Sequence, residues 1–325
     1  MNKKNVAYLF PGQGAQYTGM AMDLLESAAV KTLFDTASEI FGKDVKELLN
    51  SDADTLKRTD VSQPVITVAN LAAAAYLGEQ GYAPAACAGF SLGEYAALVC
   101  AGIINAADCF RIIKARGEAM QKASDKLRDA SLQSSGGGDP SAAPGMAAVV
   151  GLEPSQVESL IKQWSGEGLK HLYAANINSP KQVVVSGTAS ALTDAEARFK
   201  EAGAKRVIRL QVAGPFHSPL MTDALDAFVP ALEAVVFKDP SITIYSNVTG
   251  QKISSGAEAK KLAVQQVTCP VRWVDEEAAV AACGAEVCLE VGPGKVLQGL
   301  WKDSGSSLPV FAAGTADDIA KIAAE

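Results

Sequence analysis

A serine stands between two glycines at the junction of an apolar run and an alanine-rich run, in the stretch AACAGFSLGEYAALVCAG, residues 85–102. The pentapeptide GFSLG matches G-x-S-x-G, which places a serine on a sharp turn when a strand precedes it and a helix follows. Gly89 and Gly93 allow neighbouring backbone to approach closely and leave Ser91 exposed at the tip of the turn. The segment therefore predicts a strand–turn–helix unit with Ser91 as a candidate nucleophile. The competing interpretation is that Ser91 only caps the helix.

Strands alternate with helices along most of the chain. Short apolar runs at residues 5–10, 86–90 and 285–291 predict buried strands, and the alanine-rich residues 60–80 predict a helix. We expect Asn105 to cap a further helix that runs to about Ser124. This alternation indicates an α/β fold with a mainly parallel sheet that is covered on both faces.

A second unit follows the stretch DASLQSSGGGDPSAAPG, residues 129–145, which is rich in Gly, Ser, Ala and Pro and predicts a flexible connector. Residues 146–212 show the order βαββαβ, a ferredoxin-like pattern. We therefore predict a small ferredoxin-like domain at 146–212, inserted into a large catalytic domain formed by residues 1–128 and 213–325.

Charge and cysteine usage exclude several classes of function. The net charge of −7 disfavours broad binding to nucleic acid or to an anionic membrane. Six cysteines without a C-x-x-C pair and only two histidines disfavour a metal site, and unpaired thiols fit a reducing compartment. The N-terminal apolar run is too short for a signal peptide, and the longest apolar stretch, VITVANLAAAAYLG, is too short to span a bilayer. We expect a cytoplasmic protein.

A serine nucleophile needs a base, and the chain offers only His171 and His217. His171 lies at the predicted start of a strand in the small domain. His217, in VAGPFHSPLM, lies between a strand and a helix, where α/β folds place their ligands. We therefore assign the base to His217. No aspartate is an obvious third member, but a backbone carbonyl can also orient a histidine.

Two further features offer groups that can bind an anion. The glycine turn LFPGQGAQ, residues 9–16, lacks the spacing of a dinucleotide site, but its backbone can present N–H groups to an anion. The N–H groups of Gln13 and Leu92 are therefore candidate oxyanion donors. Arg116 is either a solvated arginine that pairs with a nearby glutamate or a fork for a substrate carboxylate.

Seven segments in this order resemble the malonyl-CoA:acyl carrier protein transacylases and the related acyltransferase domains of polyketide synthases. The resemblance covers residues 5–310, and the segments are FPGQGAQ, GFSLGEYAAL, KARGEAM, NINSPKQVVVSG, GPFHSPLM, QQVTCPVRW and LEVGPGKVL. It implies an α/β-hydrolase-like large domain with a ferredoxin-like insert.

The resemblance also implies roles for individual residues. Ser91 would be the acylated nucleophile and His217 its base, oriented by a main-chain carbonyl near Gln266. Gln13 and Leu92 would form the oxyanion hole, and Arg116 would bind the malonyl carboxylate. Two further matches are Asn176 and Asn178, which would line the cleft, and Phe216, whose bulk would crowd an α-methyl branch.

The activity implied is a ping-pong transfer of malonyl from malonyl-CoA to the phosphopantetheine thiol of an acyl carrier protein, in fatty acid or polyketide synthesis. No metal or redox cofactor is expected, because coenzyme A is a substrate and the carrier protein holds the phosphopantetheine. Alternatives are a serine thioesterase or hydrolase, an acyltransferase for another extender unit, and a silent carrier-protein docking module.

Overall fold

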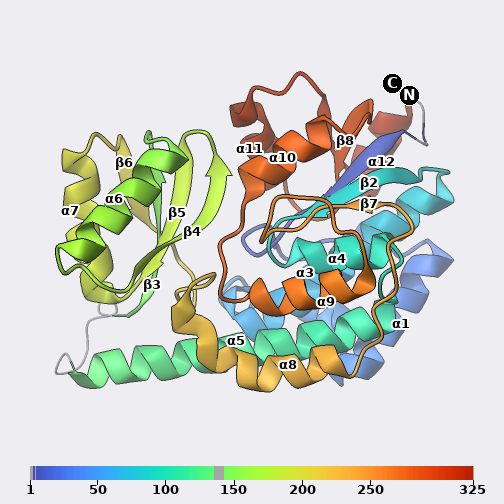
Figure 1. The fold of residues 1–325 in the computed structure, drawn as a ribbon. Coiled ribbons are helices and arrows are strands. Elements are labelled where there is room, and N and C mark those ends of the chain that lie inside the picture. Colours follow the sequence, from blue (N-terminus) through green and yellow to red (C-terminus); the bar gives the residue numbers. More distant parts are fainter. Residues whose placement is uncertain (1–2, 4, 135–142, 325) are drawn as a thin grey trace.

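A parallel five-stranded sheet forms the centre of the larger part of the protein (Figure 1). The structure is a computed structural model and describes residue 3 and residues 5–134 and 143–324. The strand order is β7-β2-β1-β8-β9, and every pairing is parallel. The strands are β1 (Val6–Phe10), β2 (Pro84–Gly89), β7 (Thr243–Ile244), β8 (Val287–Glu290) and β9 (Val310–Ala312).

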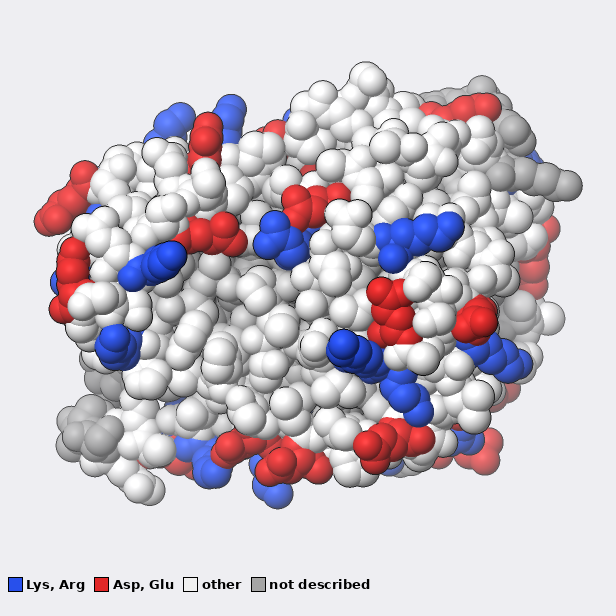
Figure 2. All heavy atoms as spheres, viewed as in Figure 1, with Lys and Arg blue, Asp and Glu red and all other residues white. Residues whose placement is uncertain are grey.

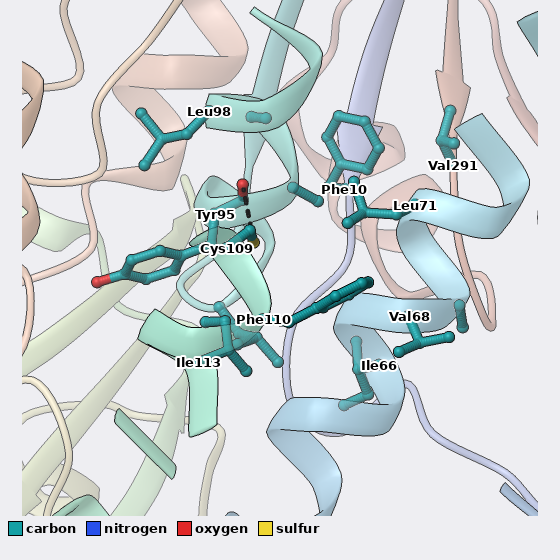
Figure 3. Close-up of a cluster of buried hydrophobic side chains, with 14 of the residues drawn as sticks. Phe10, Ile66, Val68, Leu71, Tyr95, Leu98, Cys109, Phe110, Ile113 and Val291 are labelled. Atoms are coloured by element: carbon teal, nitrogen blue, oxygen red, sulfur yellow. Dashed lines mark hydrogen bonds between the residues drawn. The ribbon is translucent and has the colours of Figure 1, made fainter. Parts of the chain in front are cut away.

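Helices bury both faces of this sheet. The sequence of the central strand β1 is apolar throughout because its side chains are buried on both sides. Val6, Tyr8 and Phe10 enter one hydrophobic cluster, whereas Ala7 and Leu9 enter another on the opposite face. The first cluster is shown in part in Figure 3, where Phe10 lies beside Leu71 of α3 (Thr59–Glu79). The helices on that face are α1 (Ala28–Phe41), α2 (Val45–Leu49), α3 (Thr59–Glu79), α4 (Gly93–Cys100), α5 (Ala106–Ser134), α8 (Leu225–Glu233), α9 (Gly256–Gln265) and α12 (Ala316–Ala324). The opposite face packs against α10 (Trp273–Ala281) and α11 (Val296–Ser304).

The smaller part has an antiparallel four-stranded sheet with a separate core, at the left of Figure 1. Its strand order, β4-β5-β3-β6, and its chain order, βαββαβ, are those of a ferredoxin-like fold, as predicted. Its elements are β3 (Gly145–Val150), α6 (Pro154–Gly166), β4 (Leu172–Ser179), β5 (Gln182–Gly187), α7 (Ala189–Glu201) and β6 (Arg206–Arg209). The predicted α/β fold with a smaller inserted unit is therefore confirmed, while the domain boundaries at particular residues remain a prediction.

Helix α5 is longer than expected. The predicted end near Ser124 is wrong, and so is the first part of the predicted connector. It continues to Ser134, so residues 129–134 are helical, and residues 135–142 lie outside the described residues. Asn105 caps its start, since its Oδ1 accepts a hydrogen bond from the N–H of Asp108 at 2.8 Å. Helix-forming residues and an ion pair between Arg128 and Asp125, one turn apart at 2.8 Å, explain the extension.

The helix expected after His217 is divided into two parts. It begins as a 3-10 helix, η4 (Pro219–Ala224), and continues as α8 after it. The hydroxyl of Ser218 donates to the carbonyl of Pro215 at 2.6 Å and makes no cap bond to the helix. The Ser218 hydroxyl therefore closes the turn that holds His217.

Helix α3 is long and apolar enough to cross a membrane, with 21 residues. The helix is longer than the apolar stretch VITVANLAAAAYLG that it contains, so the length of that stretch does not by itself exclude a membrane span. Of its most apolar window, 78% is buried inside the protein, where α3 packs against α1 and α5. Its hydrophobicity is accounted for by this position in the core.

Candidate active site

The turn that carries Ser91 depends on both of its glycines. A Cβ on Gly89 would lie 2.1 Å from the carbonyl carbon of Gly93, and a Cβ on Gly93 would lie 2.0 Å from the carbonyl oxygen of Phe10. Only glycine lets β2, β1 and the start of α4 approach so closely. Ser91 itself has φ +51°, a left-handed conformation that is strained for a residue with a side chain. The predicted strand–turn–helix context of G-x-S-x-G is confirmed.

Gly93→Ala is expected to lower the free energy of unfolding by roughly 3 kcal/mol, because the new methyl group overlaps a backbone oxygen that cannot rotate away. Urea unfolding followed by circular dichroism measures this. Gly78→Ala is the matched control, since Gly78 lies in α3 with nothing within 4 Å of its Cβ position. That control is expected to stabilise the protein by about 0.5 kcal/mol. Equal unfolding energies for the two variants would contradict the packing described for Gly93.

Ser91 and His217 meet at the carboxyl end of the parallel sheet although 126 positions separate them in the sequence. The Oγ of Ser91 lies 2.7 Å from Nε2 of His217, and Nδ1 of His217 lies 2.9 Å from the carbonyl oxygen of Gln266. A carbonyl oxygen only accepts, so the proton of a neutral His217 belongs on Nδ1 and Nε2 is free to accept from Ser91. Burial, and then the charge of Arg116, lower the pKa of His217 to about 4. The ring is therefore neutral and available as a base at pH 7.

The backbone at His217 is held in a strained conformation by its neighbours. Its φ is +55°, and the carbonyl of Phe216 accepts a hydrogen bond from Ser186 of β5 at 2.5 Å. The smaller domain thus fixes one side of the histidine turn, and the Ser218 hydroxyl fixes the other. His171, by contrast, is exposed and directly precedes β4 in the smaller domain.

Arg116 is fully buried in the middle of α5, with 1% of its surface exposed. Its Nη2 donates to Oε1 of Gln266 at 3.1 Å, and its guanidinium lies 5.4 Å from the ring centre of Tyr95. No carboxylate of a described residue lies within ion-pair distance of it, and its Nε has no partner among those residues. A buried cation without an ion-pair partner is costly unless a ligand supplies the anion. This geometry favours the carboxylate-binding interpretation over the solvated one.

The Gln266 side chain joins the parts of the site in a way that the sequence did not predict. Its Nε2 donates to the carbonyl of Ser91 at 2.9 Å and to Oε2 of Glu94 at 2.6 Å. Glu94 also accepts from the N–H of Asn247 at 3.3 Å, and burial raises its pKa to about 7. The signal for Glu94 was an acidic residue inside the apolar helix that follows the serine turn. Asn247 lies just beyond β7, at the carboxyl end of the sheet, and had no signal of its own.

The two expected oxyanion donors lie on adjacent turns beside Ser91. Gln13 follows β1, and the close contact of the two turns is visible at Gly12, whose Cβ position is 2.4 Å from the carbonyl oxygen of Phe90. Neither the N–H of Gln13 nor that of Leu92 donates to another described residue. Both residues line the cavity in front of Ser91. Two free N–H donors at this position suit a developing negative charge on a carbonyl oxygen.

A cavity of about 240 Å³ runs between the two sheets in front of Ser91. Of the nine predicted site residues, all but Gln266 line it; Gln266 lies behind Ser91 and His217. Asn176, Asn178 and Phe216 contribute the walls on the side of the smaller domain. Among the residues that the structure describes, no group of three His, Cys, Asp or Glu side chains could hold a metal ion.

Comparison with known proteins agrees with this arrangement. The family model of the acyl transferase domain matches residues 7–323. The malonyl CoA-acyl carrier protein transacylase of Bacillus subtilis (strain 168) is 36% identical over 309 residues, which are 94% of this chain and 92% of that protein. The Escherichia coli (strain K12) protein of the same name is 37% identical over 299 residues, 91% of each chain.

Solved structures are similar over nearly the whole chain. An acyl carrier protein S-malonyltransferase from Vibrio cholerae has a TM-score of 0.86 and 34% identity, and the match covers 98% of this chain and 100% of that one. A malonyl-transacylase solved in complex with its type II PKS acyl-carrier protein has a TM-score of 0.87 and 32% identity, with 98% of each chain covered.

Proposed function

The chain belongs to the acyl transferase domain family, and we propose that it transfers a malonyl group from malonyl-CoA to the phosphopantetheine thiol of an acyl carrier protein. The observation that carries the proposal is one cavity that holds a serine paired with a neutral histidine, two N–H donors and a buried arginine. Within the described part of the chain, the two N–H groups make no hydrogen bond and the arginine has no ion-pair partner. A malonyl thioester has a carbonyl for the first three groups and a carboxylate for the arginine. The similar proteins from Bacillus subtilis and Escherichia coli are named for the same reaction, since both are called malonyl CoA-acyl carrier protein transacylase.

In the first half-reaction, Ser91 attacks the thioester carbonyl while Nε2 of His217 takes its proton. The N–H groups of Gln13 and Leu92 hold the resulting oxyanion, and Arg116 pairs with the malonyl carboxylate. The carbon–sulfur bond then breaks, and His217 returns its proton to the departing CoA thiolate. The products are malonyl-Ser91 and free coenzyme A.

In the second half-reaction, the phosphopantetheine thiol of the carrier protein occupies the place that coenzyme A left. His217 takes the thiol proton, the thiolate attacks the malonyl ester, and the ester bond to Ser91 breaks as the proton passes to its Oγ. Nucleophile, base and leaving group all come from the chain or its two substrates, and no atom changes oxidation state. We therefore propose that no metal or redox cofactor takes part. The six free thiols support a reducing compartment, the cytoplasm, as its location.

Transfer of labelled malonyl from malonyl-CoA to purified holo-acyl carrier protein tests the proposed function. Parallel lines in double-reciprocal plots are expected, because each substrate reacts with a different form of the enzyme. Release of free malonate at the rate of transfer, with no label on the carrier protein, would show a hydrolase instead.

The pH dependence follows from the state of His217. Because its pKa is lowered to about 4, the ring stays neutral well below the ordinary value of 6.5. We expect kcat/KM for malonyl-CoA, which reports the free enzyme, to hold as the pH falls through 6.5 and to drop only as it approaches 4. Brief exposure to each pH, with recovery of activity at pH 7, separates protonation from unfolding. A half-maximal rate near pH 6.5 would contradict the burial of this histidine.

A further inference from the structure

The charged side chains that line the active-site cavity are all positive. Its only charged lining side chains among the described residues are Arg116 and Lys57, and no aspartate or glutamate lines it. Arg116 is buried, whereas 51% of the Lys57 side chain is exposed. One cation of the cavity lining is therefore enclosed by the protein, and the other is open to solvent.

The backbone at Lys57 is tied to the turn that carries Gln13. Lys57 ends the short helix η2 (Thr55–Lys57), and the preceding residue, Leu56, is buried. The carbonyl of Leu56 accepts a hydrogen bond from Nε2 of Gln16 at 3.3 Å, while Oε1 of Gln16 accepts from the N–H of Gly14 at 2.7 Å. One hydrogen bond thus joins the residue before Lys57 to the segment that offers an oxyanion donor, and the other lies within that segment.

The ammonium group of Lys57 is available for an anionic ligand. Its present partner is Asp54 at 2.9 Å, three residues earlier, and 90% of the Asp54 side chain is exposed. An ion pair between exposed side chains contributes little free energy, so a ligand can replace it. On the face shown in Figure 2, basic and acidic residues are interspersed around a broad uncharged centre. No large basic patch covers this face. An anionic ligand would therefore be attracted by individual cationic side chains.

We propose that Lys57 binds the 4′-phosphate of the pantetheine arm that both substrates share. This rests on the proposed function, in which coenzyme A and the carrier protein enter the same cavity in turn. The cavity wall also contains amide side chains, such as Gln63 and Gln211, and apolar ones, such as Val212 and Val296. The pantetheine arm likewise carries amide and alkyl groups. A malonyl thioester on this arm has an anionic group at each end, and the cavity is lined by two cationic side chains, Arg116 and Lys57.

The test compares Lys57→Ala with wild type on three donors: malonyl-CoA, malonyl-phosphopantetheine and malonyl-pantetheine. In a ping-pong reaction, kcat/KM for the donor reports acylation alone, so the acceptor can be kept constant. We expect kcat/KM to fall about fivefold for both phosphate-bearing donors and to stay unchanged for malonyl-pantetheine. Lys31→Ala, on the exposed face of α1, makes the same change in net charge away from the cavity and should leave all three values unchanged.

Three results would overturn the proposal. These are no loss with any donor, an equal loss with all three, and a loss confined to malonyl-CoA, which would assign Lys57 to the nucleotide phosphates. Calorimetry with phosphopantetheine and pantetheine supplies a reading that does not need catalysis. The phosphate is expected to strengthen binding to wild type and not to Lys57→Ala. If no malonyl thioester acylates the wild type, the proposed function fails, while calorimetry still decides the role of Lys57.

Discussion

His217→Asn is expected to lower kcat for malonyl transfer by roughly 1,000-fold to 10,000-fold. Nε2 of His217 is the only base within hydrogen-bond distance of the Ser91 hydroxyl among the described residues, and an unassisted hydroxyl is a poor nucleophile. Asparagine is chosen because it tolerates the φ of +55° at this position but cannot take a proton at neutral pH. Stopped-flow measurement of coenzyme A release from malonyl-CoA gives the rate of the first half-reaction directly.

The matched control is His171→Asn. His171 has a similar φ of +61° but an exposed side chain in the smaller domain. The same substitution there tests the effect of the backbone conformation without removing the imidazole that faces Ser91. Its kcat is expected to stay within about twofold of wild type. Comparable losses in both variants, or a wild-type rate in His217→Asn, would remove His217 from the reaction.

Arg116→Ala is expected to lower kcat/KM for malonyl-CoA by roughly 100-fold and to leave that for acetyl-CoA unchanged or higher. The loss corresponds to a hydrogen-bonded ion pair in a buried site, and acetyl has no carboxylate to form it. Wild type is expected to prefer malonyl because an acetyl group leaves the buried guanidinium without an ionic partner. Competition between labelled malonyl-CoA and acetyl-CoA measures the preference in one reaction.

Arg116→Lys separates charge from geometry. Lysine keeps the positive charge but loses the planar fork and the contact with the Tyr95 ring, so an intermediate preference is expected. Thermal unfolding of both variants shows whether the fold survives the change at a fully buried position. A folded Arg116→Ala that keeps the full malonyl preference would assign carboxylate recognition elsewhere.

The fold was predictable where local sequence pattern and tertiary burial agree. The run VAYLF is buried on both faces of β1, and the glycines of GFSLG are required by contacts within 2.1 Å. The end of α5 was not predictable from the Gly-rich residues, because the preceding residues 125–134 contain helix formers that extend the helix. The 3-10 turn at Pro219 depends on how His217 is held, which no local pattern specifies.

The site was predictable where a residue type had few alternatives. The chain has two histidines and one G-x-S-x-G turn, so few pairs of serine and histidine had to be considered before Ser91 and His217 were chosen. The family resemblance then implied the roles of Gln266 and Arg116. The bonds from the Gln266 side chain to Ser91, Glu94 and Arg116 span 150 to 175 positions. Such contacts depend on how α4, α5 and α9 pack together, which the spacing of residues along the chain does not reveal.

The intact mass of the enzyme after mixing with malonyl-CoA, without an acceptor thiol, tests the central claim most directly. Wild type is expected to gain one malonyl group, located on Ser91 by peptide mapping, and to lose it when holo-acyl carrier protein is added. Ser91→Ala is expected to gain none. A malonyl group on Ser91→Ala, or on a different residue of the wild type, would contradict the assignment of Ser91 as the group that carries the acyl chain.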